Sequence, residues 1–116
     1  KKFGTMPLKT SPLVICILAD SELSDVWVED ASIVSILMQL EVEKLGLGST
    51  WIQIRNRECS EGDSQEAVRK VLSIPKKYGV LSLIAIGHKN EEKKPYTDED
   101  LNFEKVHYEN FNDKNN

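Results

Sequence analysis

The chain has 116 residues, of which 40% are hydrophobic, enough for the core of one modest domain. Its formal net charge of -4 argues against a general nucleic-acid binder, because neutralising phosphates requires a basic face. We expect no membrane span, because no apolar run reaches roughly 18–20 residues and no signal-peptide pattern is present. Cys16 and Cys59 are not spaced as a metal site or a redox pair, which argues against a metal centre and favours a reducing, cytoplasmic setting.

The chain opens with a segment that lacks periodicity, followed by an apolar run. Residues 1–11 predict a loop, and a start at Lys1 indicates a cloned segment, a processed product or the later part of a longer protein. Residues 12–20 are apolar and rich in β-branched side chains, so we expect a strand buried on both faces of a sheet. Ser24 or Asp25 then offers a side chain that can cap the next helix.

Residues 26–45 predict one long helix. Its apolar side chains fall at three- and four-residue steps around more than half of the circumference, which is typical of a helix buried in a core or at a subunit interface. Three of its residues are small enough to admit another helix or a flat ligand: Ala31, Ser32 and Ser35. The glycines at 46 and 48 end the helix, and residues 50–55 predict a strand. This order excludes a dinucleotide-binding fingerprint, in which the glycine loop follows a strand and precedes a helix.

The next part of the chain predicts a helix and a strand. Residues 55–63 are polar and indicate a loop. Asp63 and Glu66 have the spacing of a capping box, so we expect a helix over residues 64–73. Its inner side should carry four apolar residues: Ala67, Val68, Val71 and Leu72. Residues 80–86 are almost entirely apolar and predict the third strand.

From residue 88 onward the composition changes. Residues 88–116 are charged and hold no self-contained core, yet they keep spaced apolar anchors that disordered tails lack. These anchors are Tyr96, Leu101, Phe103, Val106, Tyr108 and Phe111. We therefore expect an arm that packs across another part of the protein or onto a partner subunit. The whole order indicates an α/β or α+β layer fold with a central sheet over residues 12–87, in one domain or the C-terminal part of one covering residues 1–116.

Four segments carry more information than periodicity does. They are WVEDAS at the helix start, GLGSTWI at the helix–strand junction, IP before the third strand, and AIGHK with lysines after it. Together they resemble the C-terminal part of the nitroreductase family of flavin enzymes, over roughly residues 7–111. The resemblance implies an α+β sandwich, a central sheet flanked by helices, and an intertwined homodimer with FMN at its interface. It also implies hydride transfer from NAD(P)H to FMN and then to a nitroaromatic, quinone or similar small-molecule acceptor by ping-pong turnover.

The resemblance implies a set of ring-binding residues, Trp51, Ile52, Gln53 and Ile54, which match the strand beside the isoalloxazine ring. A flavin needs a flat apolar wall, which Trp51 and Ile52 could supply, and polar groups near its N5 and O4 atoms. A backbone N–H of Gln53 or Ile54 could donate to N5, and the Gln53 amide could reach a ring carbonyl. Without the resemblance, we would expect Trp51 and Ile52 to be core residues at a helix–strand junction.

Lys93 and Lys94 match the region where the family places a basic residue on the FMN phosphate. The alternative is a solvated lysine pair in an acidic tail, and Lys89 is a weaker candidate for the phosphate. We expect His88 and His107 to lie at the surface or to serve in packing, because no nucleophile and no metal-ligand spacing accompanies them. The sequence assigns no catalytic residue and no metal ligand.

The resemblance also leaves one element of the family unmatched. Residues 1–11 lack the basic Arg-x-Ser-x-Arg run that helps family members to hold FMN, so we expect these 116 residues alone to bind FMN poorly. Two other classes of protein stay open. One is a non-catalytic dimerisation or interaction module that kept the fold but lost flavin binding, which absorbance at the flavin bands would detect. The other is a small α/β domain for another nucleotide, which competition between FMN and adenine nucleotides would detect.

Overall fold

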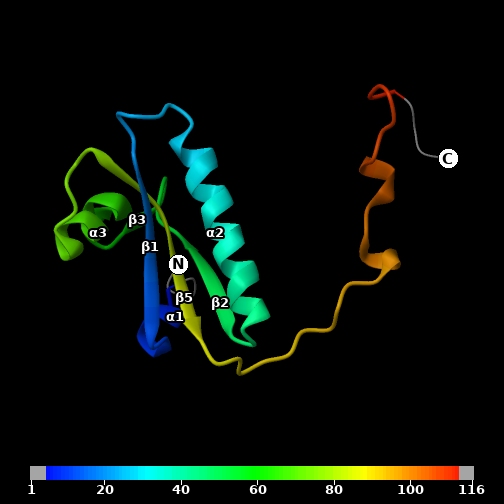
Figure 1. The fold of residues 1–116 in the computed structure, drawn as a ribbon, viewed down its shortest axis with the longest axis horizontal. Coiled ribbons are helices and arrows are strands. Elements are labelled where there is room, and N and C mark those ends of the chain that lie inside the picture. Colours follow the sequence, from blue (N-terminus) through cyan, green and yellow to red (C-terminus); the bar gives the residue numbers. More distant parts are fainter. Residues whose placement is uncertain (1–4, 113–116) are drawn as a thin grey trace.

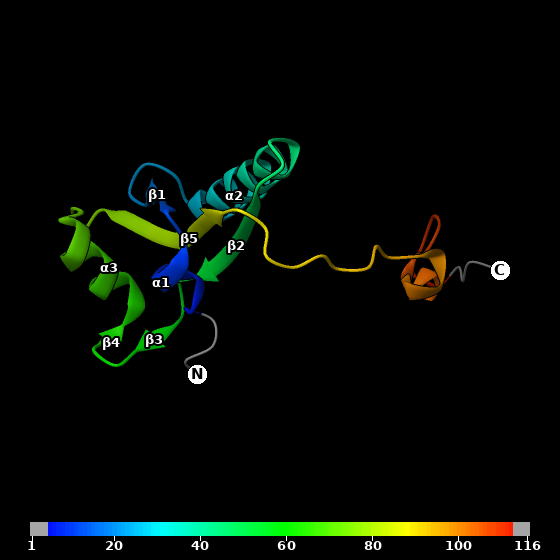
Figure 2. The ribbon, with the colours of Figure 1, turned by 90° about the horizontal axis from the view of Figure 1, so that it is seen from below.

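A computed structural model of the chain describes residues 5–112. Figures 1 and 2 show a three-stranded sheet with a helix against each face and a C-terminal arm that runs away from this body. The helices and strands are α1 (Pro7–Thr10), β1 (Leu13–Asp20), α2 (Trp27–Lys44), β2 (Gly48–Gln53), β3 (Glu58–Cys59), β4 (Gly62–Asp63), α3 (Ser64–Leu72) and β5 (Tyr78–Gly87). Two 3-10 turns, η1 (Asp98–Asp100) and η2 (Phe103–Lys105), lie in the arm. The expected α+β class is confirmed.

β5 is the central strand and pairs antiparallel with β1 on one side and β2 on the other. Ile84 of β5 lies opposite Ile15 of β1 and Trp51 of β2. Residues 79–86 are all buried, because both faces of this strand are covered. β1 lies at an edge, and Ile17 is its one buried residue. The expectation of a strand buried on both faces is therefore wrong for β1.

The sheet separates the hydrophobic core into two clusters. The cluster on the α2 side contains Ile17, Ala31, Val42, Leu81, Ile84 and Ile86. The cluster on the α3 side contains Ile52, Ile54, Val80, Leu83 and Ala85. A bulge in the β1–β5 pairing shifts the register of the two strands and with it the face to which successive side chains point. Ile17 lies opposite Ser82, but Leu18 lies opposite Val80.

α2 packs on the sheet through a narrow stripe of buried residues, Ala31, Ser35 and Val42. The Ser35 hydroxyl donates to the Ala31 carbonyl at 2.8 Å and lies 3.1 Å from the Ser82 hydroxyl. Large apolar side chains on the outer side of the helix are exposed: Ile33, Val34, Ile36, Leu37 and Leu40. Burial of the whole helix within this chain is therefore a wrong expectation, and burial at a subunit interface stays a prediction.

The two ends of α2 differ in how they are capped. Val26 is the N-cap and no side chain caps this end, so the expected cap by Ser24 or Asp25 is wrong. The preceding turn is held instead by Asp20, whose carboxylate accepts two backbone N–H groups. At the other end Gly46 has a φ of 75°, a left-handed conformation that glycine adopts without strain. The glycine-marked helix end is confirmed.

Residues 55–63, expected to be a loop, contain a short hairpin. Its strands β3 and β4 pair Glu58 with Asp63 and Cys59 with Gly62. Asp63 is also the N-cap of α3, because its carboxylate accepts the Glu66 N–H at 3.1 Å. The predicted start of this helix is confirmed.

α3 uses only part of its apolar side within the chain. Val68 packs against the α3-side cluster, as expected from the sequence. Val71 and Leu72, expected on the same inner side, are 80% and 53% exposed, so that expectation is wrong for this chain alone.

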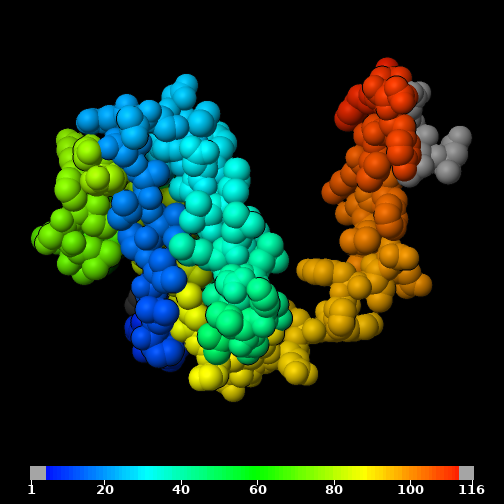
Figure 3. Space-filling model, viewed as in Figure 1, coloured from blue at the N-terminus to red at the C-terminus, as the bar shows by residue number. Residues whose placement is uncertain are grey.

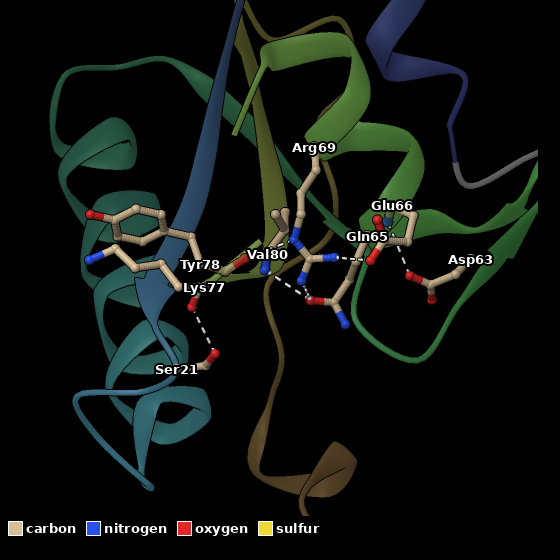
Figure 4. A network of polar contacts seen from close by, with 8 residues as sticks. All are labelled: Ser21, Asp63, Gln65, Glu66, Arg69, Lys77, Tyr78 and Val80. Carbon is tan, nitrogen blue, oxygen red and sulfur yellow. Dashed lines mark hydrogen bonds and ion pairs between the residues drawn. The ribbon is translucent and has the colours of Figure 1, made fainter. Parts of the chain in front are cut away.

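A polar network around Arg69 ties α3 to the start of β5 (Figure 4). Arg69 donates from Nε to the Tyr78 carbonyl at 2.9 Å and from Nη1 to the Glu66 carboxylate at 2.8 Å. The amide oxygen of Gln65 accepts the Val80 N–H at 2.9 Å. Arg69 therefore connects the helix surface to the backbone of the central strand.

Replacing Arg69 with methionine should lower the free energy of unfolding by about 1–2 kcal/mol, because methionine keeps an apolar stem but leaves the Tyr78 carbonyl without its donor. Urea denaturation measures this loss. Lys70→Met is the matched control, since Lys70 is the exposed neighbour on the same helix and should change stability by less than about 0.5 kcal/mol. Equal losses in the two variants would contradict the role given to Arg69.

Figure 3 shows the arm standing apart from the body. Its expected anchors are all exposed: Tyr96, Leu101, Phe103, Val106, Tyr108 and Phe111. The arm is ordered locally, since Asp100 accepts the N–H and the hydroxyl of Thr97, which lowers the pKa of that carboxyl. These six anchors, which lie between residues 96 and 111, are thus not buried against the body of the same chain, and packing onto a partner subunit stays a prediction.

Candidate functional site

β2 is an edge strand, and its pleat divides the four residues expected beside a flavin ring. Trp51 is half-buried against the α2-side cluster, and Gln53 lies on the same side, within hydrogen-bonding distance of its indole. Ile52 and Ile54 are 4% and 6% exposed and belong to the cluster on the α3 side. The structure therefore brings Trp51 and Gln53 together and assigns the two isoleucines to the core.

The side chains of Trp51 and Gln53 form a hydrogen-bonded chain along this strand. The indole N–H of Trp51 donates to Gln53 Oε1 at 3.0 Å, and Gln53 Nε2 donates to the Arg55 carbonyl at 2.8 Å. The Arg55 guanidinium lies 5.9 Å from the ring centroid of Trp27, within cation–π distance. The amide nitrogen of Gln53 carries a second N–H, which could donate to a ligand carbonyl without breaking either of these bonds.

The backbone of β2 offers hydrogen-bonding groups at its outer edge. The Ile54 N–H donates to the Leu81 carbonyl at 3.1 Å and so faces β5. Gln53 lies opposite Ser82 while the Ile54 N–H reaches Leu81, which is the pattern of a non-hydrogen-bonded pair, so the Gln53 N–H points to the outer edge, where no strand pairs with β2 within residues 5–112. Of the two backbone donors expected from the sequence, Gln53 is the one that this geometry leaves open to a ligand.

A groove of about 1080 Å³ lies where the ends of the sheet meet the first residues of the arm. The start of β2, including Ser49 and Thr50, forms one part of its lining, and His88, Lys89 and Lys93 line another. Lys94, Trp51 and Gln53 are not among its lining residues. The structure thus places Lys93 beside the beginning of the strand whose later residues carry the open edge.

Lys89 crosses this groove next to a glycine. A Cβ at Gly48 would lie 3.1 Å from Lys89 Cγ, so the glycine permits the close passage. Lys89 pairs with the carboxylate of Glu43 near the end of α2, whereas Lys93 Nζ lies 3.7 Å from Glu91 in an exposed pair. The resemblance makes Lys89 a weaker candidate than Lys93, and nothing in the local sequence shows that this lysine lies close to β2.

Other kinds of site find no support in the part of the chain that the structure describes. Over residues 5–112 no group of three histidine, cysteine or acidic side chains could hold a metal ion. The helices in this range include none that is long and apolar enough to cross a membrane. His88 is exposed at the groove, and His107 stacks on Phe111 with ring centroids 4.5 Å apart.

Comparison with known proteins identifies the family. A sequence model described as the Nitroreductase family matches residues 6–88, and the chain belongs to that family. The chain is 34% identical over 113 residues to a protein of Archaeoglobus fulgidus named "Putative NADH dehydrogenase/NAD(P)H nitroreductase", covering 92% of this chain and 62% of that protein. A protein of the same name from Methanothermobacter thermautotrophicus is 32% identical, with 92% and 54% covered.

Solved structures agree with this assignment. An "FMN-dependent Nitroreductase" of Clostridium difficile R20291 is 50% identical with a TM-score of 0.86, covering 90% of this chain and 61% of that one. A nitroreductase-type structure from Bacteroides thetaiotaomicron is 27% identical with a TM-score of 0.78, and 90% and 58% are covered. The chain therefore spans between about half and two thirds of the length of these relatives.

Proposed function

We propose that the chain is part of a cytoplasmic, FMN-dependent NAD(P)H oxidoreductase of nitroreductase type, with the outer edge of β2 as one wall of the flavin site. The observation that carries this proposal is that Trp51 and the open N–H of Gln53 share an unpaired strand edge close to a lysine-lined groove. FMN held at this wall would supply the redox chemistry, which is hydride transfer from NAD(P)H and, in a second half-reaction, electron transfer to a nitroaromatic, quinone or similar acceptor. The relative named as FMN-dependent supports the choice of cofactor.

The residues present fit FMN, and they divide into those that could contact the ring, those that could bind the phosphate and those that hold the strand in place. Trp51 offers a flat apolar surface that is only half-buried, and the Gln53 N–H is a donor of the kind that a ring nitrogen accepts. Lys93 and Lys94 offer mobile point charges for a phosphate, with Lys93 lining the groove and Lys94 exposed beside it. Ile52 and Ile54 act as positioning residues, since their burial holds the strand against β5.

We also propose that two copies of the chain associate as a homodimer. The outer side of α2 carries contiguous exposed aliphatic residues, and the arm carries exposed aromatic ones. Apolar patches of this kind on a soluble protein mark interaction surfaces. A second copy could cover both at once, with the arm of each protomer lying on its partner.

A non-catalytic dimerisation module remains the second candidate function. It is favoured by one observation: the Gln53 side chain is already hydrogen-bonded to the Trp51 indole and to the Arg55 carbonyl, so its position does not depend on a ligand. The dimer surfaces would be the same in both candidates. Flavin binding alone separates them.

Adding FMN should raise the melting temperature of the purified chain, because a ligand that binds the native state stabilises it. AMP, which has no isoalloxazine ring, should leave the melting temperature unchanged. The shift should be small, since the chain lacks the family's N-terminal basic run. The double variant Lys93→Glu, Lys94→Glu should abolish it, and Lys70→Glu on α3 is the control. No shift with FMN would favour the non-catalytic module, and an equal shift with AMP would favour a domain for another nucleotide.

A further inference from the structure

An arginine just beyond the end of β2 lies on the same side of the sheet as the proposed flavin wall. Arg55 is half-buried, and its guanidinium lies 5.9 Å from the ring centroid of Trp27. Trp27 packs against the α2-side cluster, and so does Trp51. Arg55 therefore extends the row of side chains that Trp51 and Gln53 begin on this side of the strand.

The guanidinium of Arg55 has no anionic partner in the part of the chain that the structure describes. Over residues 5–112 the five ion pairs involve other cations, and no N–H of the Arg55 side chain donates a hydrogen bond. The other two arginines do donate, Arg69 to α3 and β5 and Arg57 to the Asn56 carbonyl. The five N–H donors of Arg55 are thus available to a ligand.

The ring on which the guanidinium rests is itself held in place. A Cβ built at Gly79 would lie 2.4 Å from Cη2 of Trp27, so the indole lies directly against the backbone of β5, where glycine leaves room for it. A guanidinium over an aromatic ring is attracted to its face by about 0.5–2 kcal/mol. Because Arg55 is supported in this way before a ligand arrives, less conformational entropy is lost on binding.

Building on the proposed function, we propose that Arg55 binds an anionic oxygen group, a carboxylate or a phosphate, of the substrate that stacks on the flavin. The planar fork of a guanidinium matches two oxygens of such a group. Residues advance about 3.3 Å each along a strand, so the backbone of Arg55 lies within about 7 Å of the open N–H of Gln53. A substrate stacked on a ring held by that N–H would bring a substituent within reach of the arginine side chain. Arg55 is thus a specificity residue that favours anionic over neutral substrates.

Two nitroaromatic probes of the same shape test this preference, para-nitrobenzoate with a negative charge and para-nitrobenzamide without one. Each is titrated into the chain in the presence of FMN, and the indole N–H resonance of Trp27 reports binding beside Arg55. The benzoate should bind about tenfold more tightly than the benzamide. Arg55→Gln should reduce this ratio to about one, and Arg55→Lys should restore it in part. Arg57→Gln, the matched control on an exposed neighbour, should keep the full ratio.

The Arg55→Gln variant should leave the flavin wall intact. The Gln53 amide donates to the backbone carbonyl of residue 55, which the substitution does not alter. Circular dichroism checks the fold, and the shift of the Trp51 resonance with FMN should be the same in the variant and in the wild type.

A second pair of probes separates the two sources of the anionic group. NADPH and NADH differ by one phosphate, so a preference for NADPH that depends on Arg55 would assign the residue to the co-substrate. A preference for the benzoate alone would assign it to the electron acceptor. The inference is overturned if the wild type prefers neither anionic probe, or if Arg55→Gln keeps the preference while FMN still shifts Trp51. FMN that leaves the Trp51 resonance in place overturns the proposed function, and the inference with it.

Discussion

Replacing Gly79 with alanine should lower the free energy of unfolding by about 2–3 kcal/mol, because the added methyl group overlaps the ring of Trp27. A Cβ built at Gly79 lies 2.4 Å from Cη2 and 2.6 Å from Cζ2 of that ring. Gly79 is buried near the start of β5, and Trp27 is the first residue of α2. The ring can move aside only by giving up part of the contact that joins the helix to the sheet.

A double-mutant cycle identifies the cause. In a Trp27→Leu background the cost of Gly79→Ala should fall below about 1 kcal/mol, because the smaller side chain removes the overlap. Urea denaturation of the four proteins gives the coupling energy. Gly46→Ala provides a contrast, since its cost arises from a φ of 75° with no atom near the new Cβ, and it should be the same in both backgrounds. A cost for Gly79→Ala that does not depend on residue 27 would show that the overlap is not its origin.

Leu37→Asp should convert the proposed dimer to a monomer. Leu37 is 57% exposed at the middle of the outer side of α2, where a partner would bury it. A carboxylate buried there without a cation opposite it costs several kcal/mol. The dissociation constant of the dimer should therefore rise by at least about 100-fold. Sedimentation equilibrium over a range of protein concentrations measures this change.

The control for this variant carries the same chemistry on the other side of the sheet. Val71→Asp introduces a carboxylate at an exposed residue of α3, which the dimer does not need, and it should leave the dissociation constant unchanged. A wild-type chain that stays monomeric at high concentration would refute the homodimer. So would a dimer that both variants preserve, because α2 would then lie outside the interface.

The elements of the fold follow from the sequence because each depends on local patterns. The apolar run of β5, the left-handed glycine after α2 and the Asp63 cap of α3 all lie where the sequence predicted them. The errors concern burial, which depends on what surrounds an element. β1 carries the composition of a central strand but lies at an edge, and the outer side of α2 is exposed in a single chain.

The candidate site was predictable only in part. The family resemblance points to the run from Trp51 to Ile54 as one surface beside the ring, whereas alternation along a strand divides these residues between two faces. Which backbone donor stays open depends on the pairing of β2 with β5, which is a long-range property. The approach of Lys89 to Gly48 likewise joins segments about forty residues apart, and local periodicity does not report such contacts.

The central claim is that the outer edge of β2 forms one wall of a flavin site, and nuclear magnetic resonance of the tryptophan indole groups tests it most directly. The chain has two tryptophans, and Trp27→Phe assigns the Trp51 indole N–H resonance by elimination. On titration with FMN, the Trp51 resonance should shift progressively and far more than that of Trp27, while AMP should move neither. A titration in which FMN leaves the Trp51 resonance in place, or moves only Trp27, would contradict the account.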